Sequence, residues 1–230
     1  MLQRVMRYAL TLLMLSLVAV TPLFAGGSRE ADQQPQDGRS EPATAEGAPE
    51  DAGDSGSGDT EAGDAEADAT AISSELRNTL RQAGVQPLNS RVPYEDFTLP
   101  TLDESERSLA SFEGNVVVIN FWASWCGPCV QEMPAMQALY EDLKDSNFTI
   151  VAVNVQEQPD VVRTFIEENG YTFPVLRDAS GRVAGRYGVR GLPTSYIMAP
   201  NGDLIGAKVG YHDWNTEAVR SAVARILEQS

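Results

Sequence analysis

Two long runs of apolar residues mark the second half of the chain. They lie at residues 115–122 (NVVVINFW) and 148–155 (FTIVAVNV). A strand of a parallel sheet has this composition when helices cover both of its faces, because neither face meets water. The two runs therefore predict two buried strands of a parallel sheet.

The residues between these strands follow the period of a helix. Apolar side chains recur every three or four positions, at Val130, Met133, Met136, Tyr140 and Leu143. Pro134 lies inside this helix and should kink it, because proline has no amide hydrogen and clashes with the preceding turn. Another helix is predicted at 159–169, with a proline in its first turn and Gly170 after its last residue.

The last third of the chain predicts a hairpin and a final helix. Strands at 194–199 and 204–209 flank Asn201-Gly202, a dipeptide typical of tight hairpin turns. An amphipathic helix follows at 214–227, with Asp213 placed to cap it. Parallel strands joined by helices, followed by an antiparallel hairpin, predict an α/β fold with a mixed central sheet and helices on both faces.

The first 25 residues predict an export signal. They have a basic start, an apolar centre and a cleavage point after Ala25. An uncleaved membrane anchor is the alternative, since the apolar stretch reaches the lower length limit for a membrane-spanning helix. Either way the protein is expected to be exported, periplasmic or otherwise extracytoplasmic, and soluble or tethered.

Residues 26–70 hold 13 acidic and two basic residues, which is most of the chain's net charge of −16. This segment has no aromatic or branched aliphatic residue, so it cannot bury enough apolar surface to offset the entropy of ordering. We expect a disordered acidic linker, with a docking tail as the alternative, and no binding to nucleic acid. Residues 71–91 should form a short helix, at 72–83, and a linker; residues 92–230 should form one domain.

The chemistry of the sequence centres on Trp125-Cys126-Gly127-Pro128-Cys129, which follows the first buried strand and contains the only two cysteines. In an oxidising compartment, a lone close pair indicates a redox site. Cys126 falls at the start of a helix, where free N–H groups and the positive end of the helix dipole favour a thiolate. Cys129 lies one turn further on, within reach for a disulfide, and Pro128 suits the first turn.

A structural disulfide or half of a zinc site would also place two cysteines close together. Zinc usually needs four ligands, and the only histidine, His212, is far away in sequence. We expect His212 to be exposed and to have no redox role. A static disulfide rarely links residues three apart at a strand-to-helix junction. The pair therefore predicts thiol–disulfide exchange without a metal or an organic cofactor.

The stretches INFWASWCGPCVQEMP and GLPTSYIMAPNGDLI resemble the thioredoxin superfamily, and more closely its exported TlpA/ResA/DsbE-like branch. The similarity covers residues 92–230. VPYEDFTLP resembles the leading segment of that branch, and residues 148–177 resemble its extra strand–helix insertion. The resemblance implies a thioredoxin-like three-layer sandwich and the activity of a thiol–disulfide oxidoreductase.

The resemblance also implies roles for single residues. Pro193 matches a cis-proline that faces the disulfide and leaves the Leu192 backbone free to pair with substrate; an ordinary trans-proline is the alternative. Glu132 matches an acidic residue that tunes or deprotonates Cys129; a solvated surface glutamate is the alternative. Asn120 replaces the buried aspartate of plain thioredoxins, and because asparagine cannot take a proton, the role of base passes to Glu132 or water.

The expected catalytic residues are Cys126, Cys129 and Glu132. Substrate contacts are expected from Trp125, Gly127, Pro128, Leu192, Pro193 and Thr194. Trp122, Tyr196 and Met198 are expected to pack in the core and the sheet.

The Gly-Pro dipeptide between the cysteines is that of reducing thioredoxins, with potentials of about −270 mV, against about −120 mV for the oxidant DsbA. We therefore predict a reductant of protein disulfides. The resemblance suggests apocytochrome c as substrate and a DsbD/CcdA-like membrane electron donor, with a monomeric protein. A peroxiredoxin-type peroxidase and a Sco-like copper-binding module are the alternatives.

Overall fold

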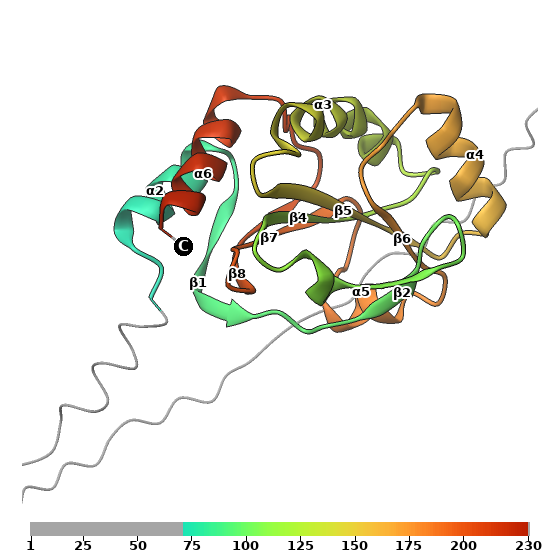
Figure 1. The fold of residues 1–230 in the computed structure, drawn as a ribbon, viewed down its shortest axis with the longest axis horizontal. Helices are drawn as coiled ribbons and strands as arrows, with labels where there is room; N and C mark the ends of the chain where they lie inside the picture. Colours follow the sequence, from blue (N-terminus) through green and yellow to red (C-terminus); the bar gives the residue numbers. More distant parts are fainter. Residues whose placement is uncertain (1–70, 230) are drawn as a thin grey trace, which may run out of the picture. The chain divides into compact units, whose positions relative to one another are not determined.

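The computed structural model describes residues 71–229. The expected export signal at 1–25 and acidic linker at 26–70 lie outside the described residues. The described part of the chain forms five α-helices and a six-stranded sheet, and Figure 1 shows how they are arranged. Within 71–229, none of the helices has the length and apolar character needed to cross a membrane.

The sheet is mixed. Its strand order is β1-β8-β7-β4-β5-β6. In that order the strands are β1 (Gln86–Pro93), β8 (Asp203–Val209), β7 (Thr194–Met198), β4 (Val116–Trp122), β5 (Phe148–Val155) and β6 (Val175–Asp178). The β4–β5 and β5–β6 pairs are parallel and the other pairs are antiparallel. Every residue of β4 and β5 is buried, as their apolar sequences predict.

Helices cover both faces of this sheet (Figure 1). They are α2 (Ser74–Gln82), α3 (Gly127–Leu143), α4 (Pro159–Asn169), α5 (Arg182–Arg186) and α6 (Glu217–Glu228). One apolar core joins the sheet to α2, α3, α4 and α6. The other joins it to α5, the 3₁₀ turn η1 (Leu109–Phe112) and β2 (Thr98–Pro100), which pairs with β3 (Glu106–Ser108). The predicted three-layer α/β fold is confirmed.

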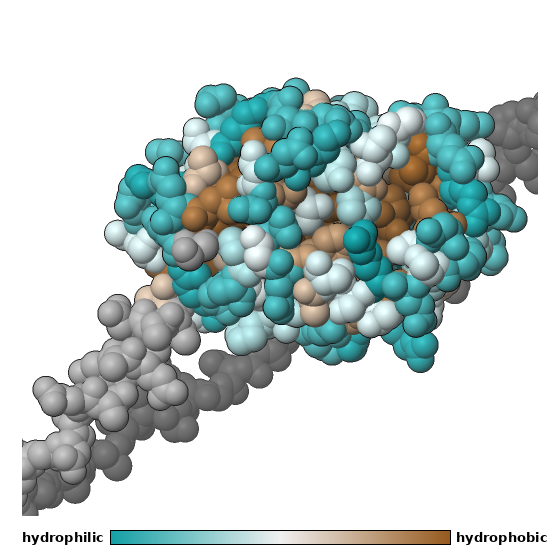
Figure 2. Space-filling model, in the orientation of Figure 1, coloured by the Kyte–Doolittle hydropathy of each residue, from teal (hydrophilic) through white to brown (hydrophobic). Residues whose placement is uncertain are grey.

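Several helices and strands lie where the local sequence predicts them. The bounds of β5 and α4 are the predicted ones, and α4 ends at Gly170, which has a left-handed φ of 67°. The β7–β8 hairpin forms around the predicted turn. Helix α3 contains Pro134 and runs as one element from Gly127 to Leu143. Figure 2 shows a largely hydrophilic outer surface, with apolar residues visible between the surface elements.

The structure corrects the expected linker before residue 92. Residues 86–93 form β1, which pairs with β8 at the edge of the sheet and has a register irregularity between Pro87 and Val92. Proline is unusual inside a strand because it has no amide hydrogen to donate, so the two prolines of β1 kept sequence patterns from predicting it. Helix α2 also belongs to the folded unit, because Leu76 and Leu80 are buried in the core that includes α6. The packed unit therefore begins before residue 92.

The cap of the last helix also differs from the prediction. Helix α6 starts at Glu217, and the side chain of Thr216 accepts a hydrogen bond from the Val219 amide at 3.2 Å. Asp213 accepts instead from the Asn215 amide at 3.0 Å. Asp213 thus fixes a turn in the loop before α6 and does not cap the helix.

Candidate active site

The cysteine pair lies where β4 passes into α3. Cys126 is the N-cap of α3, and its Sγ accepts a hydrogen bond from the Cys129 amide at 3.3 Å. The two cysteines form a disulfide, with Cα atoms 5.2 Å apart. The predicted reach between the sulfurs is confirmed. The Cys126 sulfur therefore lies at the positive end of α3, where the dipole and the amide hydrogens stabilise a thiolate.

The two sulfurs differ in their access to solvent. Cys126 is 6% exposed and Cys129 is fully buried behind it, whereas the neighbouring Trp125 is 71% exposed. Gly127 and Pro128 are exposed as well. A large partner can therefore approach Cys126 across this rim, while Cys129 is reached only from inside the protein.

The loop before β7 returns to the same end of the sheet. The Leu192–Pro193 peptide bond is cis, as the resemblance implies. Thr194 follows it and pairs with Phe121, one residue before the end of β4. The Pro193 carbonyl accepts from the Gly210 amide at 2.8 Å. Pro193 and Thr194 are buried, and Leu192 is half-buried.

Thr194 differs from the other expected substrate contacts. Its hydroxyl donates to the Gly191 carbonyl at 2.7 Å. The side chain thus closes its own loop and does not present a free hydroxyl to substrate.

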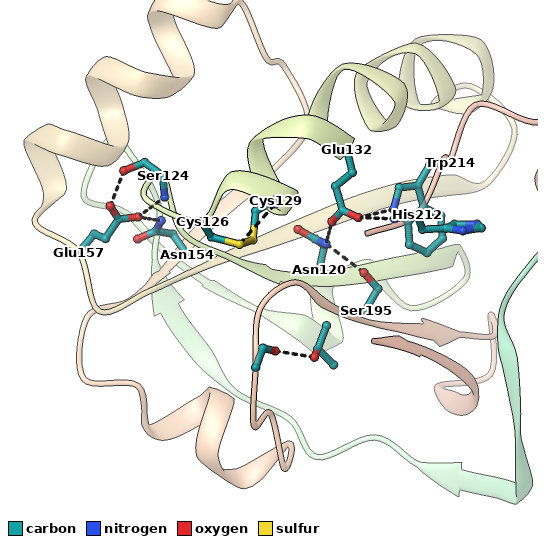
Figure 3. The surroundings of a disulfide bond; sticks show 12 residues. Asn120, Ser124, Cys126, Cys129, Glu132, Asn154, Glu157, Ser195, His212 and Trp214 are labelled. Carbon is teal, nitrogen blue, oxygen red and sulfur yellow. Dashed lines mark hydrogen bonds between the residues drawn. A yellow bond between two sulfur atoms is a disulfide. The ribbon is translucent and has the colours of Figure 1, made fainter. Parts of the chain in front are cut away.

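Glu132 lies two helical turns from Cys126 and points into the protein (Figure 3). It is 1% exposed, so the alternative of a solvated surface glutamate is wrong. Its Oε1 accepts from Asn120 Nδ2 at 2.7 Å. Its Oε2 accepts from the His212 amide at 3.1 Å and from Trp214 Nε1 at 3.4 Å. Three donors from two distant segments therefore hold one buried carboxyl.

Burial raises the pKa of Glu132 from its ordinary value of 4.5 to about 7. The hydrogen bonds from Asn120, the His212 amide and Trp214 act in the opposite direction, as does the charge of Lys208. Desolvation dominates because charge is far less stable away from water. A carboxyl with a pKa near neutrality can both take up and release a proton under ordinary conditions.

Asn120 connects this carboxyl to the sheet. It is fully buried in β4, and its Nδ2 also donates to Ser195 Oγ at 3.0 Å. Its Oδ1 has no hydrogen-bond partner among the residues that the structure describes. In Figure 3 the Asn120 side chain lies between the disulfide and Glu132.

Sequence patterns missed the loop before α6 as part of the site. His212 is half-buried, and its ring packs edge-on against Trp214 with centroids 4.6 Å apart. The expectation that His212 is exposed is therefore wrong. Trp214 is buried and lies 82 positions from Glu132. No local signal could have joined these residues, because the contact depends on how α6 packs.

Glu157 is a second residue that sequence patterns missed. Its Oε2 accepts from the Ser124 amide at 2.7 Å and from Asn154 Nδ2 at 2.6 Å, and its Oε1 accepts from the Ser124 hydroxyl. Ser124 lies two residues before Cys126. Glu157 thus fastens the segment that carries the disulfide to the end of β5 (Figure 3).

The described part of the chain contains no group of three or more His, Cys, Asp or Glu side chains arranged to hold a metal ion. The His212 ring lies against Trp214 and the two cysteines are bonded to each other.

Comparisons with known proteins agree with this geometry. A family model described as "AhpC/TSA family" matches residues 90–206. The thiol-disulfide oxidoreductase ResA of Oceanobacillus iheyensis is 44% identical over 113 residues, which cover 47% of this chain and 59% of that protein. The ResA of Halalkalibacterium halodurans is 34% identical over 132 residues, covering 57% of this chain and 71% of that protein.

A known crystal structure has a similar fold. It is of a Chlorobium tepidum protein that was proposed to be the thiol:disulfide interchange protein DsbE. That protein is 33% identical, with a TM-score of 0.56, and the match covers 61% of this chain and 99% of that chain. Together, the matched family model, the ResA relatives and the shared fold around a close cysteine pair show that this chain belongs to the AhpC/TSA family, among its thioredoxin-like, ResA- and DsbE-like members.

Proposed function

We propose that the protein is an extracytoplasmic thiol–disulfide oxidoreductase that reduces disulfides of other proteins. One observation carries the proposal: a nearly buried sulfur caps α3 and is bonded to a fully buried sulfur, with a carboxyl of raised pKa on the same helix. The relatives named thiol-disulfide oxidoreductase ResA support the proposal. Export is supported by the sequence of residues 1–25.

The first step uses Cys126. Its thiolate attacks one sulfur of a substrate disulfide, so that a bond forms between Cys126 and substrate, and the other substrate sulfur leaves as a thiolate that takes a proton from solvent. The Cys129 amide and the helix dipole stabilise the attacking thiolate. The exposed rim of Trp125, Gly127 and Pro128 offers the contact surface for the substrate chain.

The second step uses Cys129 and Glu132. The Cys129 thiol gives its proton to the Glu132 carboxylate, and its sulfur attacks Cys126. The intramolecular disulfide forms and the second substrate sulfur leaves as a thiolate. Glu132 suits this role because its pKa of about 7 is close to that of an activated thiol. Asn120, at the position of the usual aspartate, cannot take the proton.

Each cycle leaves the protein oxidised, so a dithiol donor must restore it. We propose a DsbD/CcdA-like membrane electron donor and, as substrate, apocytochrome c during cytochrome maturation. The resemblance to the TlpA/ResA/DsbE-like branch supports both. The Gly-Pro dipeptide between the cysteines supports the reducing direction.

The peroxidase and copper-binding alternatives find less support. The AhpC/TSA match is compatible with a peroxidase, but the sulfurs here lie three residues apart in one disulfide. A Sco-like module needs cysteines four apart with a nearby histidine.

Replacing Cys126 by serine should abolish reduction of insulin disulfides by the dithiothreitol-coupled protein, because the attacking sulfur is lost. Cys129→Ser should keep the first attack and accumulate the mixed disulfide, which non-reducing electrophoresis detects. Reduction of insulin by the Cys126→Ser variant at the wild-type rate would refute the proposed function.

The midpoint potential of the Cys126–Cys129 pair should be about −270 mV, as in reducing thioredoxins. Titration against dithiothreitol and glutathione buffers measures it, with the quenched thiols counted by mass. A midpoint above about −180 mV would reverse the proposed direction of electron flow.

Deletion of the gene should diminish haem-stained c-type cytochromes, because their haem-binding cysteines would remain oxidised. The wild-type gene should restore them and the Cys126→Ser gene should not. Normal cytochrome levels in the deletion strain would remove apocytochrome c as the substrate and leave the oxidoreductase activity itself untouched.

The raised pKa of Glu132 predicts a pH-dependent stability of the oxidised protein. Folded Glu132 keeps its proton up to a pH of about 7, whereas unfolded Glu132 releases it near 4.5. The free energy of unfolding should therefore fall as pH rises between these values, by up to about 3 kcal/mol. Urea unfolding at pH 4.5, 6 and 8 measures this.

The Glu132→Gln variant should lose this part of the pH dependence and exceed the wild type in stability at pH 8. Glu168→Gln, which replaces an exposed glutamate of α4, is the control and should keep the wild-type profile. Equal profiles for wild type and Glu132→Gln would contradict the assigned cause.

A further inference from the structure

Only the nitrogen of the Asn120 side-chain amide has hydrogen-bond partners in the described part of the chain. Its Nδ2 donates twice, to Glu132 and Ser195, while its Oδ1 has no partner in the described part of the chain. Leaving a buried carbonyl unpaired destabilises the folded protein, because the group loses its hydrogen bonds to water and gains none. Where Glu132 is ionised the network favours this orientation, because exchanging the two ends would set Oδ1 against the Glu132 carboxylate, acceptor against acceptor.

The unpaired oxygen points toward the disulfide and away from Glu132 (Figure 3). Figure 3 shows Asn120 between the two cysteines and Glu132, with its nitrogen end turned to Glu132. In the disulfide the Cys129 sulfur has no hydrogen to donate. On reduction it gains a weak S–H donor at a fully buried position, where any acceptor has to come from the protein.

We propose that Asn120 is a positioning residue that links the resolving cysteine to Glu132: in the dithiol form its Oδ1 accepts from the Cys129 thiol while its Nδ2 holds the carboxylate. The inference rests on the proposed function. The bond keeps the Cys129 thiol neutral and its sulfur in place. In the resolving step the proton passes to the carboxylate, Cys129 bonds to Cys126, and the substrate thiolate leaves.

An amide suits this position because one end accepts and the other donates. An aspartate here would set a second carboxylate against buried Glu132, and two like charges without water repel strongly. The other charged or titratable groups around Glu132 are Lys208 of β8, and His212 and Asp213 of the loop before α6. Neither Lys208 nor His212 forms a hydrogen bond with Glu132 through its side chain.

The first test follows the resolving step alone. A mixed disulfide between Cys126 and a peptide thiol is formed, and its decay is timed by rapid quench at pH 7. Asn120→Leu keeps the size of the side chain and removes its hydrogen bonds to Glu132 and Ser195 together with the proposed bond to Cys129, so it should slow this decay at least ten-fold. In a protein that already carries Glu132→Gln, adding Asn120→Leu should slow the decay by less than a further two-fold. The effects of two residues that act as one unit are not additive.

The second test does not depend on turnover. In the Cys126→Ser protein, infrared spectroscopy of the Cys129 S–H stretch reports its hydrogen bond, and Asn120→Leu should shift the band toward that of a free thiol. Carbon-13 NMR of the oxidised protein follows Glu132, whose pKa should rise when the Asn120 donor is removed. An asparagine without a bond to Cys129 would shift the Glu132 pKa but leave the S–H band unchanged.

Trp122→Phe is the matched control. It removes the indole Nε1 of the same strand, which is also buried without a partner in the described part of the chain, and Trp122 packs against Phe165. This variant should leave the S–H band and the decay rate unchanged. If Asn120→Leu does not fold, Asn120→Asp is used in its place. This variant should keep the S–H hydrogen bond and raise the pKa of Glu132.

Two results would overturn the role of Asn120. One is an unshifted S–H band in Asn120→Leu, and the other is an unchanged pKa of Glu132 in Asn120→Asp. Failure of the wild-type protein to reduce insulin would instead overturn the proposed function. The infrared and NMR measurements would still decide whether Asn120 joins the two groups.

Discussion

A carboxyl held out of water beside a disulfide is the constraint on which this site depends. Glu132 stays in the interior because donors from β4 and from the loop before α6 surround it, and desolvation still raises its pKa to about 7. On the surface the same side chain would ionise fully and could take no proton at neutral pH. Its burial therefore places a carboxyl with a pKa near neutrality on the helix that carries the cysteines, as the proposed role of base requires.

The fold separates the two halves of the chemistry in space. Cys126 meets the solvent at the N-terminus of α3, where the dipole favours its thiolate. Cys129 lies behind it, on the side where Asn120 and Glu132 meet. Glu157 ties the connecting segment to the end of β5 through Ser124. In the proposed mechanism, attack from outside and proton transfer inside would thus take place on two sides of one helical turn.

The residues just after helix α2 support this arrangement from a distance. Gly84, just after α2, has a φ of 74°, and a Cβ there would lie 2.7 Å from the His212 ring. The main chain of His212 in turn holds Glu132. Residue 84 and the loop before α6 both lie outside the 90–206 range of the family match. The carboxyl therefore depends partly on segments that the family pattern does not include.

The sequence by itself determined what neighbouring residues encode. The buried strands, the ends of α4, the hairpin and the cysteine pair follow from apolar runs, caps and spacing, and all are found. The resemblance added the cis bond before Pro193. Strand β1, the burial of Glu132 and its contact with Trp214 were decided only by tertiary structure, because hydrogen bonding and desolvation there join segments up to 82 positions apart.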